Sequence, residues 1–143
     1  MKPKTRISSL SDKELFQLVK FVRSYCEMTF GINKRKRKKL NVKLFQRAEE
    51  SKKICGWYCP FENEITMFIK PNKDVREFCR TFIHEYTHYM QPCRTKYHKL
   101  LKEYGYDKHP FELQAYATEK HYGKKCMDIL KLTNKIKKWN QLN

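Results

Sequence analysis

The sequence has little negative charge and no long apolar run. Its 143 residues include 15 Asp and Glu against 32 Lys and Arg, for a formal net charge of +17. No apolar stretch of about 18 residues is present, so no transmembrane helix is expected. The N-terminal MKPKTRISSL is basic but is not followed by an apolar segment, so no secretory signal is expected. We therefore predict a soluble, intracellular, cytoplasmic protein.

The sequence also lacks a second closely spaced cysteine pair. Six cysteines are present, and Cys55 and Cys59 are spaced C-x3-C, as in half of a zinc knuckle. The next two, Cys79 and Cys93, lie too far apart to complete such a site. Because thiols stay reduced inside cells, we expect free cysteines of structural role.

The length and composition fit one domain, residues 1–143, with 40% hydrophobic residues to form a single core. The positive charge favours nucleic acid or another polyanion as a partner, with a merely solvated basic surface as the alternative. Six consecutive cations, Lys34 to Lys39, predict an exposed loop. This run is compatible with nuclear localisation or phosphate binding, or with an ordinary basic surface loop. The oligomeric state is not predicted.

The first half of the chain predicts one helix and a small sheet. SDKELFQLVKFVRSYCEMTFG starts with Ser11 and Glu14 at capping-box spacing, carries apolar residues at helical intervals and stops at Gly31. Three β-prone runs follow, LNVKLFQ, KKICGWY and NEITMFIK. They predict about three strands of a small antiparallel or mixed sheet, of which the antiparallel form fits best.

The second half predicts helices. Apolar residues recur every three or four positions from Val75 to Met90, and Pro92 ends this helix. Another helix is expected over residues 95–104. A third should start at Pro110 and end near Tyr122, before Gly123, and a basic amphipathic helix should follow in KCMDILKLTNKIKKWN. The fold class is therefore α+β.

The stretch TFIHEYTHYM carries the clearest chemical signal. His84 and His88 are four residues apart, so on a helix their rings point from one face toward one point. Zinc accepts two such nitrogens. Glu85 stands beside His84, where a carboxylate can take a proton from a zinc-activated water without binding the metal. This H-E-x-x-H motif in an amphipathic helix predicts a catalytic zinc site rather than two surface histidines.

A catalytic zinc needs a third protein ligand and one open position. The position six residues after His88 is Arg94, which excludes the metzincin pattern of three histidines. Glu112 comes 24 residues after His88 on the helix opened by Pro110, and the small Ala115 one turn later would let the two helices approach closely. His109 is the main competitor, and Glu119 is expected to lie too far along the helix. The other candidates are His98 and His121.

HEYTH followed by a helix with E-x-x-A resembles the gluzincin metallopeptidases, especially the minimal ImmA/IrrE-type domains and small phage or viral proteins of that kind. The resemblance covers about residues 54–122. It implies a zincin-like fold with one zinc ion per chain held by His84, His88 and Glu112, with Glu85 as general base. It also implies hydrolysis of protein or peptide substrates. By analogy, NEITMFIK forms the edge of the sheet above the cleft and pairs with an extended substrate.

The sequence departs from this family at one position and leaves other roles open. Gluzincins often carry an acidic or amide residue four positions after the ligand glutamate to orient the first histidine, and here that residue is Tyr116. Two alternatives remain. One is a nucleic-acid-associated protease similar to Spartan, with His109 as third ligand. The other is a non-catalytic zinc-binding regulatory protein. The candidates for stabilising an oxyanion are Tyr97, His98, Tyr104, Tyr106 and His109.

Overall fold

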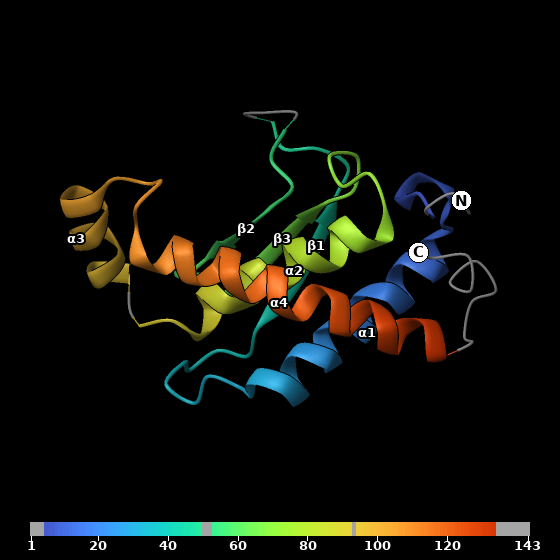
Figure 1. Cartoon of the computed structure of the whole chain (residues 1–143), viewed down its shortest axis with the longest axis horizontal. Helices are drawn as coiled ribbons and strands as arrows, with labels where there is room; N and C mark the ends of the chain where they lie inside the picture. The colour runs from blue at the N-terminus through green and yellow to red at the C-terminus, as the bar shows by residue number, and fades with distance from the viewer. Residues whose placement is uncertain (1–4, 50–52, 93, 134–143) are drawn as a thin grey trace.

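The structure is a computed structural model that describes residues 5–49, 53–92 and 94–133. Within these ranges, four α-helices pack with a three-stranded sheet, which confirms the predicted α+β class (Figure 1). The elements are a short 3₁₀ helix η1 (Ile7–Ser9), α1 (Asp12–Phe30), β1 (Asn41–Phe45), β2 (Gly56–Cys59), β3 (Glu64–Phe68), α2 (Val75–Met90), α3 (Arg94–Tyr104) and α4 (Pro110–Leu132).

Helix α1 begins and ends where its sequence predicts. The Ser11 side chain accepts a hydrogen bond from the Glu14 backbone N–H, and the Glu14 carboxylate accepts one from the Ser11 N–H. This capping box satisfies donors that the first helical turn leaves unpaired. Gly31 ends the helix with φ of 84°, a conformation that glycine adopts without steric cost.

The sheet is mixed, so the antiparallel form that the β-prone runs favoured is wrong. Its strand order is β1-β3-β2, with β1 parallel to β3 and β2 antiparallel to β3. The β2–β3 turn contains Asn63 at φ of 49°, a left-handed conformation that asparagine tolerates better than most residues. The reversal at this hairpin makes β2 antiparallel, whereas the longer connection between β1 and β2 lets β1 join the far side of β3.

The run NEITMFIK, which contains β3, is the central strand rather than the predicted edge. Ile65 and Met67 are fully buried and pack in the core with residues of the helices. Both edges of β3 already carry hydrogen-bonded neighbours, so it has none free for another chain. Strand β2 pairs on one side with β3 and forms one edge of the sheet.

Helix α2 has the predicted bounds and forms the centre of the core. The Asp74 side chain accepts a hydrogen bond from the Glu77 backbone N–H and caps the first turn. Phe78, Phe82 and Tyr86 follow at four-residue intervals and are fully buried. They pack in one apolar cluster with residues of α1, α4 and the sheet. The apolar face of α2 is thereby fixed against the core. This packing sets the direction in which the side chains on the other faces of α2 point.

Helix α4 is longer than predicted, because Gly123 lies inside it and does not end it. The segment expected to form a separate C-terminal helix continues α4 as far as Leu132, and residues 134–143 lie outside the described part of the chain. A Cβ atom on Gly123 would come within 2.7 Å of Arg80 Cγ on α2. The glycine therefore lets α4 pack closely along α2. Ala115 is fully buried, as the predicted close approach requires.

The described helices include none that is both long and apolar enough to cross a membrane.

Candidate metal centre

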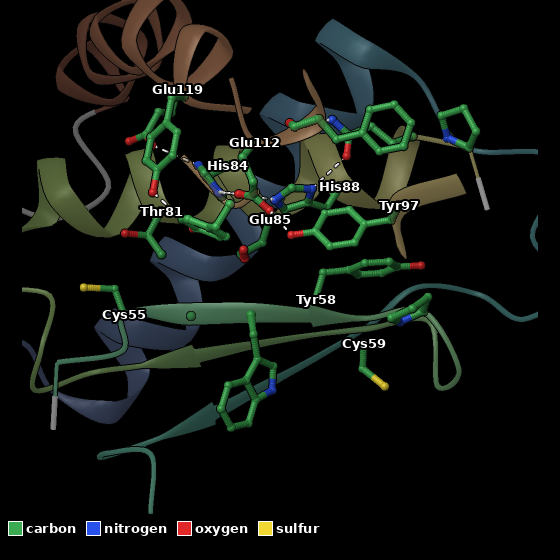
Figure 2. A pocket seen from close by; sticks show the side chains of 18 of the residues that line it. Cys55, Tyr58, Cys59, Thr81, His84, Glu85, His88, Tyr97, Glu112 and Glu119 are labelled. Carbon is green, nitrogen blue, oxygen red and sulfur yellow. Dashed lines mark hydrogen bonds and ion pairs between the residues drawn. The ribbon is translucent and has the colours of Figure 1, made fainter. Parts of the chain in front are cut away.

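Two imidazole nitrogens and one carboxylate oxygen meet between α2 and α4. The Nε2 atoms of His84 and His88 lie 3.2 and 3.1 Å from the same oxygen, Oε1 of Glu112 (Figure 2). The histidines point the same way because they are one turn apart on α2. Ligand atoms of His84, Glu85 and His88 also lie within 4.8 Å of one another. The structure thus brings together all four residues that the sequence predicted for the site.

Glu112 is placed by the start of α4. His109 caps that helix, since its Nδ1 accepts a hydrogen bond from the Phe111 N–H, and Pro110 occupies the first turn. The second carboxylate oxygen of Glu112 accepts a short hydrogen bond, 2.6 Å, from the Tyr97 hydroxyl of α3. Burial alone would raise the pKa of Glu112, but hydrogen bonds from the two histidines and Tyr97 lower it well below the usual range. The carboxylate is therefore held in its charged form.

The other nitrogen of each histidine also has an acceptor. His84 Nδ1 lies 3.0 Å from Glu119 Oε1, and His88 Nδ1 lies 2.7 Å from Gln91 Oε1. The amide of Gln91 is oriented because its nitrogen donates to the Phe111 carbonyl. Both partners accept, so both Nδ1 atoms carry protons. In the metal-free protein the Nε2 atoms donate to Glu112 Oε1, and a metal ion would take the place of these Nε2 protons. Such outer partners fix the tautomer that metal binding requires.

Glu119 therefore contacts the ring nitrogen at which the resemblance expects an orienting residue from position 116. It meets His84 Nδ1 and not the point where both Nε2 atoms converge on Glu112, so the structure does not place it as a third ligand. Its second oxygen lies 3.5 Å from Arg80 Nε, so α2 holds it from two sides. The Tyr116 ring packs edge-on against the His84 ring at 4.6 Å, while its hydroxyl lies 3.3 Å from that of Tyr106. The ring of Tyr116 thus supports His84 by packing, and its hydroxyl points to another partner.

The protonation of His84 follows from these contacts. Burial would lower the pKa of His84, but hydrogen bonds to Glu112 and Glu119 outweigh it and raise the pKa to about 10. The same balance raises the pKa of His88, where the bond to Glu112 opposes burial. Two acidic partners on one ring favour a bound positive charge. A proton supplies that charge in the metal-free protein, and a metal cation on Nε2 would replace it.

Glu85 is buried and incompletely paired. Only 6% of its surface is exposed, and Oε2 is a buried atom with no hydrogen-bond partner among the described residues. Burial raises the pKa of Glu85, although the neighbouring His84 and His88 lower it when charged. A buried polar atom without a partner is costly and calls for an unseen donor such as water. A raised pKa makes the Glu85 carboxylate a stronger base than an exposed carboxylate.

The four residues border a cleft of about 930 Å³. Strand β2 forms the wall opposite the histidines, with Cys55 and Cys59 toward its two ends (Figure 2). Gly56 lets β2 lie close to α2, because a Cβ atom at this position would come within 3.1 Å of the side chains of Met67 and Thr81. Asn72 holds this end of the wall, since its buried amide donates to the carbonyls of Cys55 and Phe68.

The predicted alternative ligand, His109, does not match the geometry. His109 is fully buried, and its ring nitrogens are both used, Nδ1 by the Phe111 N–H and Nε2 by the Tyr97 carbonyl at 2.9 Å. It has no lone pair for a metal. Cys55 and Cys59 are free thiols, and among the described residues neither belongs to a cluster of side chains that could bind a metal ion.

Among the candidates for stabilising an oxyanion, Tyr97, His98 and Tyr106 line the cleft. Tyr97 is engaged with Glu112, and its ring stacks on that of His109 at 4.1 Å. Tyr104 is exposed and does not line the cleft, and the remaining histidine, His121, is exposed on α4 and packs on Tyr122.

The donor set agrees with what a metal ion would need. Two imidazole Nε2 atoms and one carboxylate converge, and the partners of both Nδ1 atoms accept protons. The carboxylate of Glu85 lies beside them, and its Oε2 has no hydrogen-bond partner among the described residues. Zinc in hydrolases commonly has two histidines, one carboxylate and one open position. The residues therefore fit zinc. Comparisons with protein-family models, curated proteins and solved structures found no significant match.

Proposed function

We propose that the protein is a zinc-dependent peptidase. The observation that carries the proposal is the meeting of His84 Nε2 and His88 Nε2 at one oxygen of Glu112. The buried carboxylate of Glu85 lies beside them, and its Oε2 has no hydrogen-bond partner in the described part of the chain. Structural zinc sites are usually closed by four protein ligands, whereas three ligands and a nearby base favour catalysis. A zincin-like, gluzincin-type site is the best interpretation of this arrangement.

In this proposal, His84, His88 and Glu112 hold the ion, while Glu119 and Gln91 keep the rings in the binding tautomer. Bound zinc supplies Lewis-acid chemistry, which lowers the pKa of water and polarises a carbonyl. Glu85 takes the water proton on Oε2 and later gives it to the leaving amine. Burial assists this step, because the raised pKa of Glu85 makes its carboxylate a stronger base than an exposed one.

The proposed substrate is an extended protein or peptide segment. Strand β2 borders the cleft and forms an edge of the sheet, so its outer backbone groups are available to pair with another strand. Main-chain hydrogen bonds of this kind bind a peptide with little dependence on its sequence. Selectivity must then come from side chains that line the two ends of the cleft.

The first test is the metal content of purified wild-type protein and of Glu112→Ala. We expect about one zinc per wild-type chain and loss of zinc in Glu112→Ala. His121→Ala, which changes an exposed histidine on the same helix, is the matched control and should keep the metal. Iron is measured in the same samples, because two histidines and a carboxylate also bind non-haem iron. Iron in place of zinc, or an unchanged zinc content in Glu112→Ala, would contradict the proposal.

The predicted Spartan-like alternative has a separate test. It requires His109 as ligand, and the engagement of both ring nitrogens of His109 argues against that part. The net charge of +17 still favours contact with nucleic acid. His109→Ala should keep zinc but lower stability through the lost helix cap. Nucleic-acid binding that falls steeply with added salt would support the polyanion partner, and no binding at low salt would exclude it.

The non-catalytic alternative makes Glu85 dispensable. In a zinc-binding regulatory protein, Glu85→Gln would leave every cellular activity intact while zinc stayed bound. The peptidase proposal instead expects Glu85→Gln to keep zinc and lose hydrolysis.

A further inference from the structure

The cleft carries a cation that the proposed chemistry does not use. Lys36 belongs to the basic loop, which we define as residues 34–39, and it is the one lysine or arginine that lines the cleft in the described part of the chain. Its Nζ lies 5.5 Å from the centroid of the Tyr58 ring on β2. Lys36 also borders a smaller hollow of about 280 Å³, whose lining includes Lys34, Arg37, Lys38 and Lys39 of the basic loop. The loop and the cleft therefore meet at this side chain.

The basic loop is tied to the elements that build the site. On its N-terminal side, the Asn33 backbone N–H donates to the Tyr89 hydroxyl, and the Asn33 amide donates to the Tyr89 carbonyl. Tyr89 directly follows His88 on α2. On the other side, the buried Asn63 donates to the Lys38 carbonyl. The loop is thus held at both ends by hydrogen bonds, so the position of Lys36 depends on the same helix as the histidines.

Asn63 also fixes the aromatic surface beneath Lys36. The Tyr58 hydroxyl donates to Asn63 Oδ1 at 2.7 Å, and the Tyr58 ring packs against the ring of Tyr89 at 6.1 Å. One buried side chain thereby connects the basic loop with the wall of the cleft. A cation held over an aromatic ring, with its ammonium at a cleft, needs little rearrangement to receive an anionic group.

The acidic and basic side chains that line the cleft lie at different places. Among the described residues, the acidic ones that line it are Glu85, Glu112 and Glu119, and all three belong to the proposed metal centre. None is left for a cationic side chain of a substrate. Lys36 lies over Tyr58 in the lining of the cleft, and it belongs to a loop that carries five more cations. An acidic side chain would be attracted there, and a basic one would be repelled.

We propose that Lys36 forms a subsite for an acidic side chain, so that the cleft prefers extended peptides with Asp or Glu at one fixed distance from the scissile bond. This inference deepens the proposed peptidase function, and its cleavage aspect rests on that function. The binding aspect can be measured without turnover.

The test is peptide binding to zinc-supplemented Glu85→Gln protein, which is expected to bind without cleaving. The probes are fluorescein-labelled octapeptides of Ala and Gly in which one Glu is moved through each position, with matched peptides that carry Gln. We expect a single position at which Glu binds roughly two- to fivefold tighter than Gln, the range of partly exposed ion pairs. Raising the ionic strength from about 0.01 M to about 1 M should remove the difference.

Lys36→Gln in the same background should abolish the preference while leaving the affinity for the Gln peptides unchanged. Lys34→Gln is the matched control, because it removes the same charge from the same loop at an exposed side chain that does not line the cleft. It should keep most of the preference. An equal loss in both variants would show a general field of the loop and overturn the subsite.

The remaining outcomes are also decisive. Equal affinity for Glu and Gln peptides, no binding of any peptide, or a preference that survives Lys36→Gln would each overturn the inference. Loop-dependent binding of a single-stranded oligonucleotide without any peptide preference would assign the loop to nucleic acid instead. Cleavage by wild-type protein is scored separately. Cleavage without an acidic preference refutes the subsite alone, whereas acidic binding without cleavage refutes the peptidase.

Discussion

Removal of the Glu119 carboxylate should weaken zinc binding although Glu119 does not bind the metal in our proposal. Its Oε1 lies 3.0 Å from His84 Nδ1, and only 15% of its side chain is exposed. A hydrogen bond to a charged group in such a place contributes about 1.5 to 3 kcal/mol. This corresponds to roughly a 10- to 100-fold change in affinity, the range found for outer partners of metal-binding histidines. Glu119→Ala should therefore raise the zinc Kd by that factor.

The assay is competition for zinc against a chromogenic chelator at constant pH. Glu119→Gln should lose less than Glu119→Ala, because its amide oxygen still accepts the Nδ1 proton. Tyr116→Phe is the matched control, since its hydroxyl pairs with Tyr106 and its ring remains on His84. It should change the Kd by about twofold or less. Wild-type affinity in Glu119→Ala, or a tenfold loss in Tyr116→Phe, would refute this assignment of the orienting residue.

Three more results are expected. Gly56→Ala should lower the free energy of unfolding of the metal-free protein by about 1 to 3 kcal/mol in urea denaturation, because the new Cβ crowds Met67 and Thr81; unchanged stability would contradict the close packing of β2 on α2. Burial and the adjacent Glu77 raise the pKa of Cys55 to about 11, so its thiol is protonated at neutral pH. Peptide mapping should show iodoacetamide labelling of Cys55 that is slow at pH 7 and accelerates about tenfold per pH unit up to pH 9, and a plateau below pH 9 would contradict the raised pKa. Free zinc at about 100 times its Kd should raise the free energy of unfolding by about 2.7 kcal/mol, and a chelator should reverse this, with no such gain in Glu112→Ala.

Local signals explain why α1 and α2 could be predicted closely. Ser11 and Glu14 form the cap that their spacing predicts, and α2 begins after Asp74 and ends at Met90 as expected. The metal-binding pair follows from α2 alone, because residues four apart on a helix share a face. These features depend on interactions between residues that are close together in the sequence, and sequence patterns predict such local interactions well.

The features that the sequence did not predict depend on packing between distant segments. Glu119 lies seven residues after Glu112, a spacing that puts both on one face of α4, and this was the available signal. Its role required the alignment of α4 along α2, where two turns of α4 reach the two nitrogens of one ring. Gly123 looked like a helix end, because its contact with Arg80 is a tertiary feature.

The sheet shows the same limit. The β-prone runs located the strands, but their order and direction depend on pairing between residues far apart in the chain. Register pairs Val42 with Ile65 in parallel and Tyr58 with Ile65 in antiparallel fashion. Local sequence cannot distinguish these arrangements. The edge position expected for β3 came from the family resemblance alone, and in the structure β2 forms the edge that borders the cleft.

The most direct test of the central claim is peptide hydrolysis by zinc-loaded wild-type protein compared with zinc-loaded Glu85→Gln. The substrates are a mixture of unstructured peptides, analysed by mass spectrometry, and zinc content and thermal stability are measured on the same samples. Our proposal predicts new peptide ends with the wild-type protein and, because Glu85 is the general base, a loss of at least about 100-fold in rate with Glu85→Gln at equal zinc content. Equal hydrolysis by both proteins, or no hydrolysis by a fully zinc-loaded wild-type protein, would contradict it.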